Sequence, residues 1–274
     1  MTDIVDINAY LRSMSATLFD KVWWIDKIPD YIDTVVDFGC ARADLGVLID
    51  RIMPGRFHYI GIEESDEMTQ LAGENLRYHV SGTWQIFPSL SAASESYDFK
   101  NSVLVLNSVL HEVFTYKSEP EIQSLMSQIH DLGFSCIAIR DMCPSRINVY
   151  DHIDANCTIL SSSYGDLWRE YNKFRRETKI AGVEYDEDTW LPEFLLKYRY
   201  RANWEREKQE KYLWNIPKKL AQYDLLGRYE IRFENKFYIP FIRDKIKEDF
   251  GIDWNYPTHI KLLLKLKNPE VQHE

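Results

Sequence analysis

Between residues 34 and 142, short apolar runs alternate with segments whose apolar residues recur at the spacing of a helix. The apolar runs are TVVDF, FHYIGIE, TWQIF, NSVLVLNSV and SCIAIRD. Most of them lack a regular polar position, which predicts strands buried on both faces, and their alternation with helices predicts parallel pairing. We therefore expect an α/β fold with a doubly wound, mostly parallel sheet. Ligands of such sheets bind beyond the carboxyl ends of the strands, at the switch point after the first strand.

Three of the intervening segments carry clear helix signals. LGVLIDRIM has apolar residues at helical spacing and stops at Pro54 and Gly55. Ser65 precedes two acids and then MTQLAGENL, as expected for an N-cap followed by a negatively charged first turn. EPEIQSLMSQIHDL is amphipathic and has a proline near its start. This order places residues 37–46, together with Glu63, on the ligand side of the predicted sheet.

The chain changes character after about residue 150. Residues 151–228 are rich in charged and aromatic residues and are predicted to be helical. RYEIRFENKFYIPF and THIKLLLKL then return to strand character, with a helix at FIRDKIKEDFG between them. We predict three segments, which are an α/β core at 1–150, a helical insert at 151–228 that caps the substrate, and terminal strands with a helix at 229–274 that rejoin the core.

The composition restricts the class of protein. The chain has 274 residues, of which 45% are hydrophobic and 14% aromatic, enough for one large core or for a core with a smaller lobe. Its net charge is −10, and residues 1–150 carry the whole excess, with 11 basic against 21 acidic residues. A chain with this balance is not a general binder of polyanions.

Targeting and metal-binding signals are missing from the sequence. No apolar run is long enough to span a bilayer, and the N-terminus lacks the pattern of a signal peptide. The four cysteines show neither a CxxC pair nor histidines at zinc spacing, so we expect no metal site and small buried hydrophobic cysteines instead. These features predict a cytoplasmic protein without membrane contact.

The stretch VVDFGCARADLG joins the first predicted strand to the first predicted helix. Gly39 allows a tight bend and a close approach of the backbone to a ligand. The amides at the start of the helix, near Leu45, point into the same crevice. Glu63 ends the second predicted strand, and each oxygen of its carboxylate can accept a hydrogen bond.

Three motifs, in this order, resemble those of class I S-adenosylmethionine-dependent methyltransferases. VVDFGCARADLG resembles the acid–x–Gly–x–Gly–x–Gly motif between the first strand and the first helix. YIGIEESDEMTQLAGENL is similar to the second motif, a strand that ends in an acid before a helix, and SVLVLNSVLHEV resembles the fourth strand with its following turn. The resemblance covers residues 33–142 and implies a Rossmann-like fold and S-adenosyl-L-methionine as the cofactor.

The resemblance also implies roles for single residues. Asp37 orders the loop and helps to bind the methionyl ammonium group, Glu63 accepts the ribose hydroxyls, and Met68 packs near the adenine. Residues 87–89 lie at the edge of the base. The cofactor-binding residues implied in this way are Asp37, Gly39, Cys40, Ala41, Glu63, Glu64, Met68, Ser89 and Asn107.

The chain departs from the first motif at two positions. Ala41 and Ala43 stand where the second and third glycines are expected. Alanine is tolerated at such positions when φ stays negative, since the methyl group then takes up space without straining the backbone. We therefore expect an altered loop that still keeps the residues that bind charge and hydroxyl groups.

His111 follows the fourth predicted strand, where the resemblance places the site of methyl transfer. An unperturbed histidine has a pKa near neutrality and can act as a base, which makes His111 the candidate catalytic residue. The alternative is a histidine that only holds the loop by a hydrogen bond. Asn107 invites comparison with amino-methyltransferases of DNA, but these require Pro-Pro-aromatic after it, and Ser-Val-Leu follows here.

The predicted insert contains LLKYRYRANWEREKQEKYLW, in which basic and aromatic residues are interleaved. Arginines together with aromatic rings can hold phosphate and stack on bases, so residues 197–206 are a candidate nucleic-acid site. The alternative, which the neighbouring glutamates favour, is a solvated amphipathic helix.

Three functions are consistent with these features. The first is a methyltransferase that uses S-adenosylmethionine and whose insert selects the acceptor, a small molecule or an RNA nucleotide. The second is a catalytically inactive binding or scaffold protein of the same fold, its pocket closed by Ala41 and Ala43. The third is a nucleic-acid-modifying enzyme that uses the Arg/Tyr/Trp-rich insert. The retention of Asp37, Gly39 and Glu63 together favours the first.

Overall fold

The computed structural model describes residues 18–145, 165–180, 190–198, 204–251 and 253–267. The contacts within the chain divide it into two compact units. Of the described residues, the sheet unit comprises 18–141, 216–235 and 261–267. The helical unit comprises 142–145, 165–180, 190–198, 204–215, 236–251 and 253–260.

Seven strands form one sheet in the order β3-β2-β1-β4-β5-β7-β6. The strands are β1 (Thr34–Phe38), β2 (His58–Ile62), β3 (Trp84–Phe87), β4 (Ser102–Asn107), β5 (Cys136–Met142), β6 (Tyr229–Phe237) and β7 (His259–Leu266). The pairs β1–β2, β1–β4, β2–β3 and β4–β5 are parallel. β7 runs against β5, because the Leu266 N–H donates to the Ser135 carbonyl and the Cys143 N–H donates to the Thr258 carbonyl. The prediction of a doubly wound, mostly parallel sheet is confirmed.

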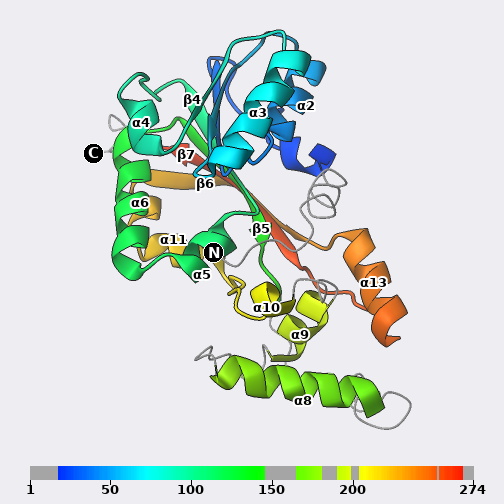
Figure 1. The fold of residues 1–274 in the computed structure, drawn as a ribbon. Coiled ribbons are helices and arrows are strands. Elements are labelled where there is room, and N and C mark those ends of the chain that lie inside the picture. Colours follow the sequence, from blue (N-terminus) through cyan, green and yellow to red (C-terminus); the bar gives the residue numbers. More distant parts are fainter. Residues whose placement is uncertain (1–17, 146–164, 181–189, 199–203, 252, 268–274) are drawn as a thin grey trace. The chain divides into compact units, whose positions relative to one another are not determined.

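Helices cover both faces of this sheet within the sheet unit. α2 (Asp44–Ile52) and α3 (Asp66–His79) lie on one face, whereas α4 (Leu90–Ser94) and α6 (Glu119–Leu132) lie on the other (Figure 1). The sequence signals predict α2, α3 and α6, but they do not indicate the shorter elements. These are α4 and the elements η1 (Leu18–Val22) and α5 (Leu110–Tyr116). The short helices α11 (Ile216–Ala221) and α12 (Leu225–Arg228) lie in the segment 151–228, which is predicted to be helical.

The predicted helix starts are capped as their residue types require. The Ser65 side chain accepts the N–H of Met68 at 3.3 Å and forms the N-cap of α3. Ser118 and Glu121 form a capping box at the start of α6, where proline occupies an early position. The caps fix where each helix begins, and therefore where the preceding strand must end.

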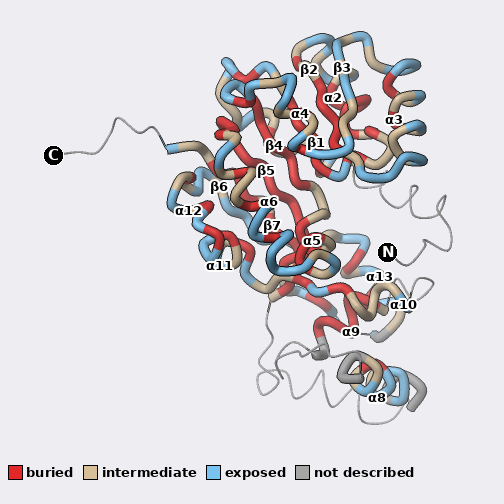
Figure 2. Tube along the Cα trace, turned by 60° about the vertical axis from the view of Figure 1, so that its left-hand side comes forward, coloured by how far each residue is buried: buried red, intermediate tan, exposed pale blue. Residues whose placement is uncertain are grey.

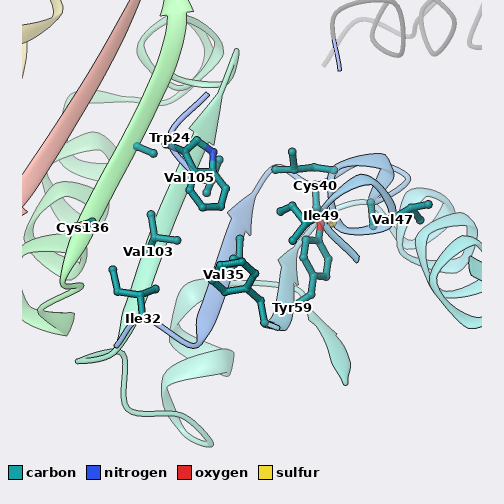
Figure 3. Packing of buried hydrophobic residues seen from close by; sticks show 14 of the residues in the cluster. Trp24, Ile32, Val35, Cys40, Val47, Ile49, Tyr59, Val103, Val105 and Cys136 are labelled. Atoms are coloured by element: carbon teal, nitrogen blue, oxygen red, sulfur yellow. The ribbon is translucent and has the colours of Figure 1, made fainter. Parts of the chain in front are cut away.

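The hydrophobic core of the sheet unit lies around its central strands. β1, β4 and β5 are buried along nearly their whole length, as Figure 2 shows. Trp24, Val35, Tyr59 and Val105 belong to one buried cluster, which also takes in residues of α2 and α3 (Figure 3). Removal of this apolar surface from water is the main favourable term in the folding of the sheet.

The helical unit has a core of its own. Its helices are α8 (Gly165–Ile180), α9 (Trp190–Tyr198), α10 (Trp204–Glu207) and α13 (Pro240–Phe250). Their apolar side chains pack together in a cluster of Met142, Phe174, Phe194, Leu195, Leu196, Tyr212, Ile242, Ile246 and Trp254. The predicted division into 1–150, 151–228 and 229–274, with the middle segment as a substrate cap, stays a prediction.

Two further expectations concern membranes and cysteines. No helix in the described parts of the chain combines the length and the apolar character that crossing a bilayer requires. Cys40, Cys136 and Cys143 are buried, as predicted, and Cys157 lies outside the described residues.

The switch point of the sheet lies at β1, which has β2 on one side and β4 on the other. The connections from β1 therefore lead to one face, and those around β4 lead to the other. The carboxyl ends of β1, β2 and β4 meet at the same edge, because the three strands are parallel. This edge carries the candidate functional site.

Candidate functional site

Asp37 lies near the carboxyl end of β1 and is 4% exposed. The hydroxyl group of Tyr59 donates a hydrogen bond of 2.7 Å to its Oδ2 atom. Burial raises the pKa of Asp37 to about 6, against the opposing effects of the Tyr59 hydrogen bond and of the Lys21 charge. The carboxylate is thus held rigidly and favours a positively charged neighbour.

The loop after β1 adopts the backbone conformation of a glycine-rich loop. Gly39 has φ of 73°, as its residue type allows, but Ala41 and Ala43 also have positive φ, at 47° and 56°. The condition under which alanine is easily tolerated, a negative φ, is therefore not met at either position. The left-handed conformation costs an alanine about 1–2 kcal/mol, so the rest of the site must hold the loop in place.

Hydrogen bonds to the neighbouring strand hold this loop. The N–H groups of Gly39 and Cys40 both donate to the carbonyl of Ile62 in β2, at 2.9 and 3.1 Å. The N–H of Ala43 donates to the Cys40 carbonyl at 2.8 Å and closes a turn just before α2. These bonds require the backbone to bend at Ala41 and Ala43 even though neither residue is glycine.

Gly46 provides close packing between α2 and the sheet. A Cβ atom at this position would lie 2.8 Å from the ring of Tyr59. Figure 3 shows this ring reaching from β2 towards Cys40 and Ile49. Because the same ring carries the hydroxyl group that binds Asp37, the absence of a side chain at Gly46 also positions the Asp37 carboxylate.

Glu63 follows β2 and joins the loop after β1 to the loop after β2. Its Oε2 atom accepts the N–H of Ala41, and its Oε1 atom accepts the N–H of Ser65, both at 2.9 Å. A carboxylate has about four lone-pair sites, so two remain for further donors such as a diol. Glu64, in contrast, has a side chain that is 60% exposed and pairs with Lys117 at 2.8 Å.

The remaining residues implied for the cofactor lie at separate places. Met68 is half-buried in the first turn of α3, and Ser89 is exposed and caps α4. Neither belongs to the pocket beside the loop. Asn107, at the end of β4, does line that pocket.

A pocket lies at the switch point, beside the carboxyl ends of β1 and β4. Its lining comes from the β1 loop, the start of α2, the end of β4 and the element η1. The lining residues are Leu18, Lys21, Asp37, Gly39, Cys40, Ala41, Arg42, Asp44, Leu45 and Asn107. Of the predicted cofactor residues, five meet here, and Glu63 contacts them through Ala41.

Lys21 is a lining residue that sequence reasoning missed. It belongs to η1, which is anchored by Asp20: the Oδ2 atom of Asp20 lies 2.6 Å from Arg140 Nε, and its Oδ1 atom accepts from Lys261. Burial alone would raise the pKa of Asp20, but these two cations outweigh it and lower the pKa. The sequence LFDKV carries no periodic signal that would predict a position at the edge of the sheet.

His111 lies in the first turn of α5 and is 7% exposed. Its Nδ1 atom lies 2.6 Å from Oδ1 of Asp141, and the other Asp141 oxygen accepts the N–H groups of Leu110 and His111. Asp141 is fully buried at the end of β5. A carboxylate facing Nδ1 favours the tautomer with the proton on Nδ1.

The candidate nucleic-acid site gains no support from the described part of residues 197–206. Lys197 is fully buried and lies 3.1 Å from Glu193, and Arg206 pairs with Glu210 at 3.0 Å. Both cations are therefore neutralised inside the helical unit. Residues 199–203 lie outside the described residues.

No protein-family model matches this sequence, and no curated protein sequence does. Solved structures resemble it in fold. A SAM-dependent methyltransferase from Aquifex aeolicus has 8% identity and a TM-score of 0.49, over 96% of this chain and 100% of that chain. The plantazolicin methyltransferase BamL, solved with SAH, has 10% identity and a TM-score of 0.48, over 96% and 87% of the two chains.

A third similar structure is the geranyl diphosphate C-methyltransferase from Streptomyces coelicolor. It has 10% identity and a TM-score of 0.45, over 93% of this chain and 77% of that chain. Similarities at this level of sequence identity show a shared fold.

Proposed function

We propose that this protein binds S-adenosylmethionine and transfers its methyl group to an acceptor. One observation carries the proposal: the Glu63 carboxylate at the end of β2 is fixed on the backbone of the β1 loop, through the N–H of Ala41. This places a carboxylate with spare acceptor capacity next to a loop of glycine-like conformation and next to the buried Asp37. Such a pair of acids suits a ligand that carries a ribose diol next to a cationic group.

The described residues fit this cofactor. Gly39 leaves room at the bend, where an added Cβ would meet Val109 Cγ2 at 3.1 Å, and α2 directs its N-terminal amides to the same edge. We assign the ribose to Glu63 and the methionyl end to the pocket around Asp37 and Asn107. The sulfonium group of the cofactor would supply the methyl group, with the thioether as a good leaving group. The protein would then mainly have to orient the acceptor and remove its proton.

His111 is the residue we propose as the base, with Asp141 as its positioning residue. The 2.6 Å bond to Asp141 fixes the imidazole ring and stabilises the protonated form after it has taken a proton. Such a base serves an acceptor that carries a removable proton, such as a hydroxyl group or a protonated amine. The identity of the acceptor, its selection by residues 151–228 and a cytoplasmic location remain predictions.

Calorimetric titration with S-adenosylmethionine and S-adenosylhomocysteine tests the proposal. We expect micromolar binding by the wild-type protein and a loss of about 10- to 100-fold in Glu63→Ala, because hydrogen bonds to a charged group are removed. Glu64→Ala is the matched control, since this neighbouring acid pairs with Lys117 and is expected to leave the affinity unchanged. A folded wild-type protein that binds neither ligand would favour the alternative of a non-catalytic scaffold.

A further inference from the structure

The pocket at the switch point contains a buried cation that none of the roles above uses. Lys21 is 6% exposed and lines the pocket. Within the described residues, its ammonium group takes part in no hydrogen bond and no ion pair within 4 Å. Asp37, Asp44 and Asp20 are close enough to favour its charge but do not pair with it.

A buried ammonium group without a partner is costly, and the structure shows the effect. Burial, followed by the nearby charge of Arg140, lowers the pKa of Lys21 to about 8. At neutral pH the group is still protonated. It therefore offers a strong binding position for an anion small enough to enter the pocket.

Asn107 presents the complementary group in the same pocket. Its Nδ2 atom donates to the backbone carbonyl of Lys21 at 3.4 Å, which determines the orientation of the amide. Its Oδ1 atom is buried and has no hydrogen-bond partner in the described residues. The carbonyl of Lys21 also accepts from Trp24 Nε1 at 3.0 Å, so η1 and the end of β4 are joined.

Within the described residues, a cation without an ion-pair partner and an acceptor without a donor thus line the same pocket, beside the carboxylate of Asp37. An α-amino acid end carries both missing groups, a carboxylate and an ammonium group, on one carbon atom. We propose that Lys21 and Asn107 form an amino-acid clamp, in which Lys21 binds the α-carboxylate and Asn107 Oδ1 accepts from the α-ammonium group of the ligand. The clamp rests on the proposed function, because it assigns the methionyl end of the cofactor.

The clamp predicts selectivity between two nucleoside ligands. S-adenosylhomocysteine has the amino-acid end, and 5′-methylthioadenosine lacks it. In calorimetric titrations, we expect Lys21→Met to lower the affinity for S-adenosylhomocysteine about 10- to 100-fold and to leave the affinity for 5′-methylthioadenosine unchanged. Asn107→Leu should act in the same direction, whereas Glu63→Ala should weaken both ligands because both contain ribose.

Thermal unfolding without ligand separates loss of the clamp from loss of the fold. Lys21→Met removes a buried charge, so the variant should unfold at or above the temperature of the wild-type protein. If Lys21→Met lowered the affinity for both ligands equally, or left the affinity for S-adenosylhomocysteine unchanged, the clamp would be overturned and the proposed function would be unaffected. A wild-type protein that binds neither ligand would overturn the proposed function, and the clamp with it.

Discussion

Both units of the molecule bury a lysine, but in different surroundings. Lys197, in the helical unit, is fully buried and has the Glu193 carboxylate at 3.1 Å, the carbonyl of Glu210 as an acceptor and the ring of Tyr212 at 4.9 Å. Lys21, in the sheet unit, is 6% exposed and lines a pocket. The contrast teaches that burial alone does not separate a structural charge from a functional one. The partners of the charged group do.

The largest expected effect follows from removing the paired lysine. Lys197→Met leaves the Glu193 carboxylate buried without its cation, and burial already raises the pKa of Glu193 despite that cation. We expect the free energy of unfolding to fall by about 3–5 kcal/mol, measured by urea denaturation. The double variant Glu193→Leu/Lys197→Met is the control and should recover most of this loss, since an apolar pair can replace a buried ion pair. A single variant as stable as the wild type would contradict a structural role for the pair.

The lysine of the pocket should respond in the opposite direction. Lys21→Met removes a buried charge that has no ion-pair partner among the described residues, and we expect the free energy of unfolding to rise by on the order of 2 kcal/mol at neutral pH. The same urea denaturation measures it. A loss of stability like that of Lys197→Met would show that the two lysines are equivalent, and the contrast between the units would fail.

The pH dependence sharpens the comparison further. The pKa of Lys21 is lowered from 10.5 to about 8 by burial and by Arg140, against the attraction of Asp37, Asp44 and Asp20. Between these two pH values the unfolded chain binds more protons than the folded one, so the stability conferred at this site rises with pH. The free energy of unfolding of Lys21→Met should exceed that of the wild type by a constant amount below pH 8, and the difference should vanish near pH 10.5. Urea denaturation at a series of pH values measures this difference. A constant difference would contradict a perturbed lysine.

The smallest effect concerns the backbone beside Lys21. Ala41 is half-exposed and has φ of 47°, so Ala41→Gly should raise the free energy of unfolding by about 1 kcal/mol. Ala92→Gly, in the helix α4, is the matched control and should lower it by a similar amount. Destabilisation by both substitutions would show that the loop is not strained.

The strands could be predicted well because their signals are local. TVVDF is β-branched and ends in an acid, and β1 has the predicted bounds, Thr34–Phe38. The placement of Asp37 and Glu63 at one edge then followed from parallel pairing alone. Their contacts did not, since the bond of Glu63 to Ala41 depends on the course of the loop.

Lys21 and the loop dihedrals could not be predicted, for physical reasons. The surroundings of Lys21 are built by residues distant in sequence, such as Arg140, which binds its neighbour Asp20 from 120 positions away. Ala41 and Ala43 have no local reason to adopt positive φ. Hydrogen bonds to Ile62 and Glu63 override their intrinsic preference, and a single sequence does not reveal such bonds.

The anchoring of η1 has a consequence for how the protein is made. Asp20 binds Lys261, which follows it by 241 residues. During synthesis, the ribosome has therefore produced β1, β2 and β4 long before the residue that completes the anchor of η1 emerges. The anchor of η1 is therefore completed only late in synthesis, and a translation product that ends before residue 261 would hold Asp20 through Arg140 alone.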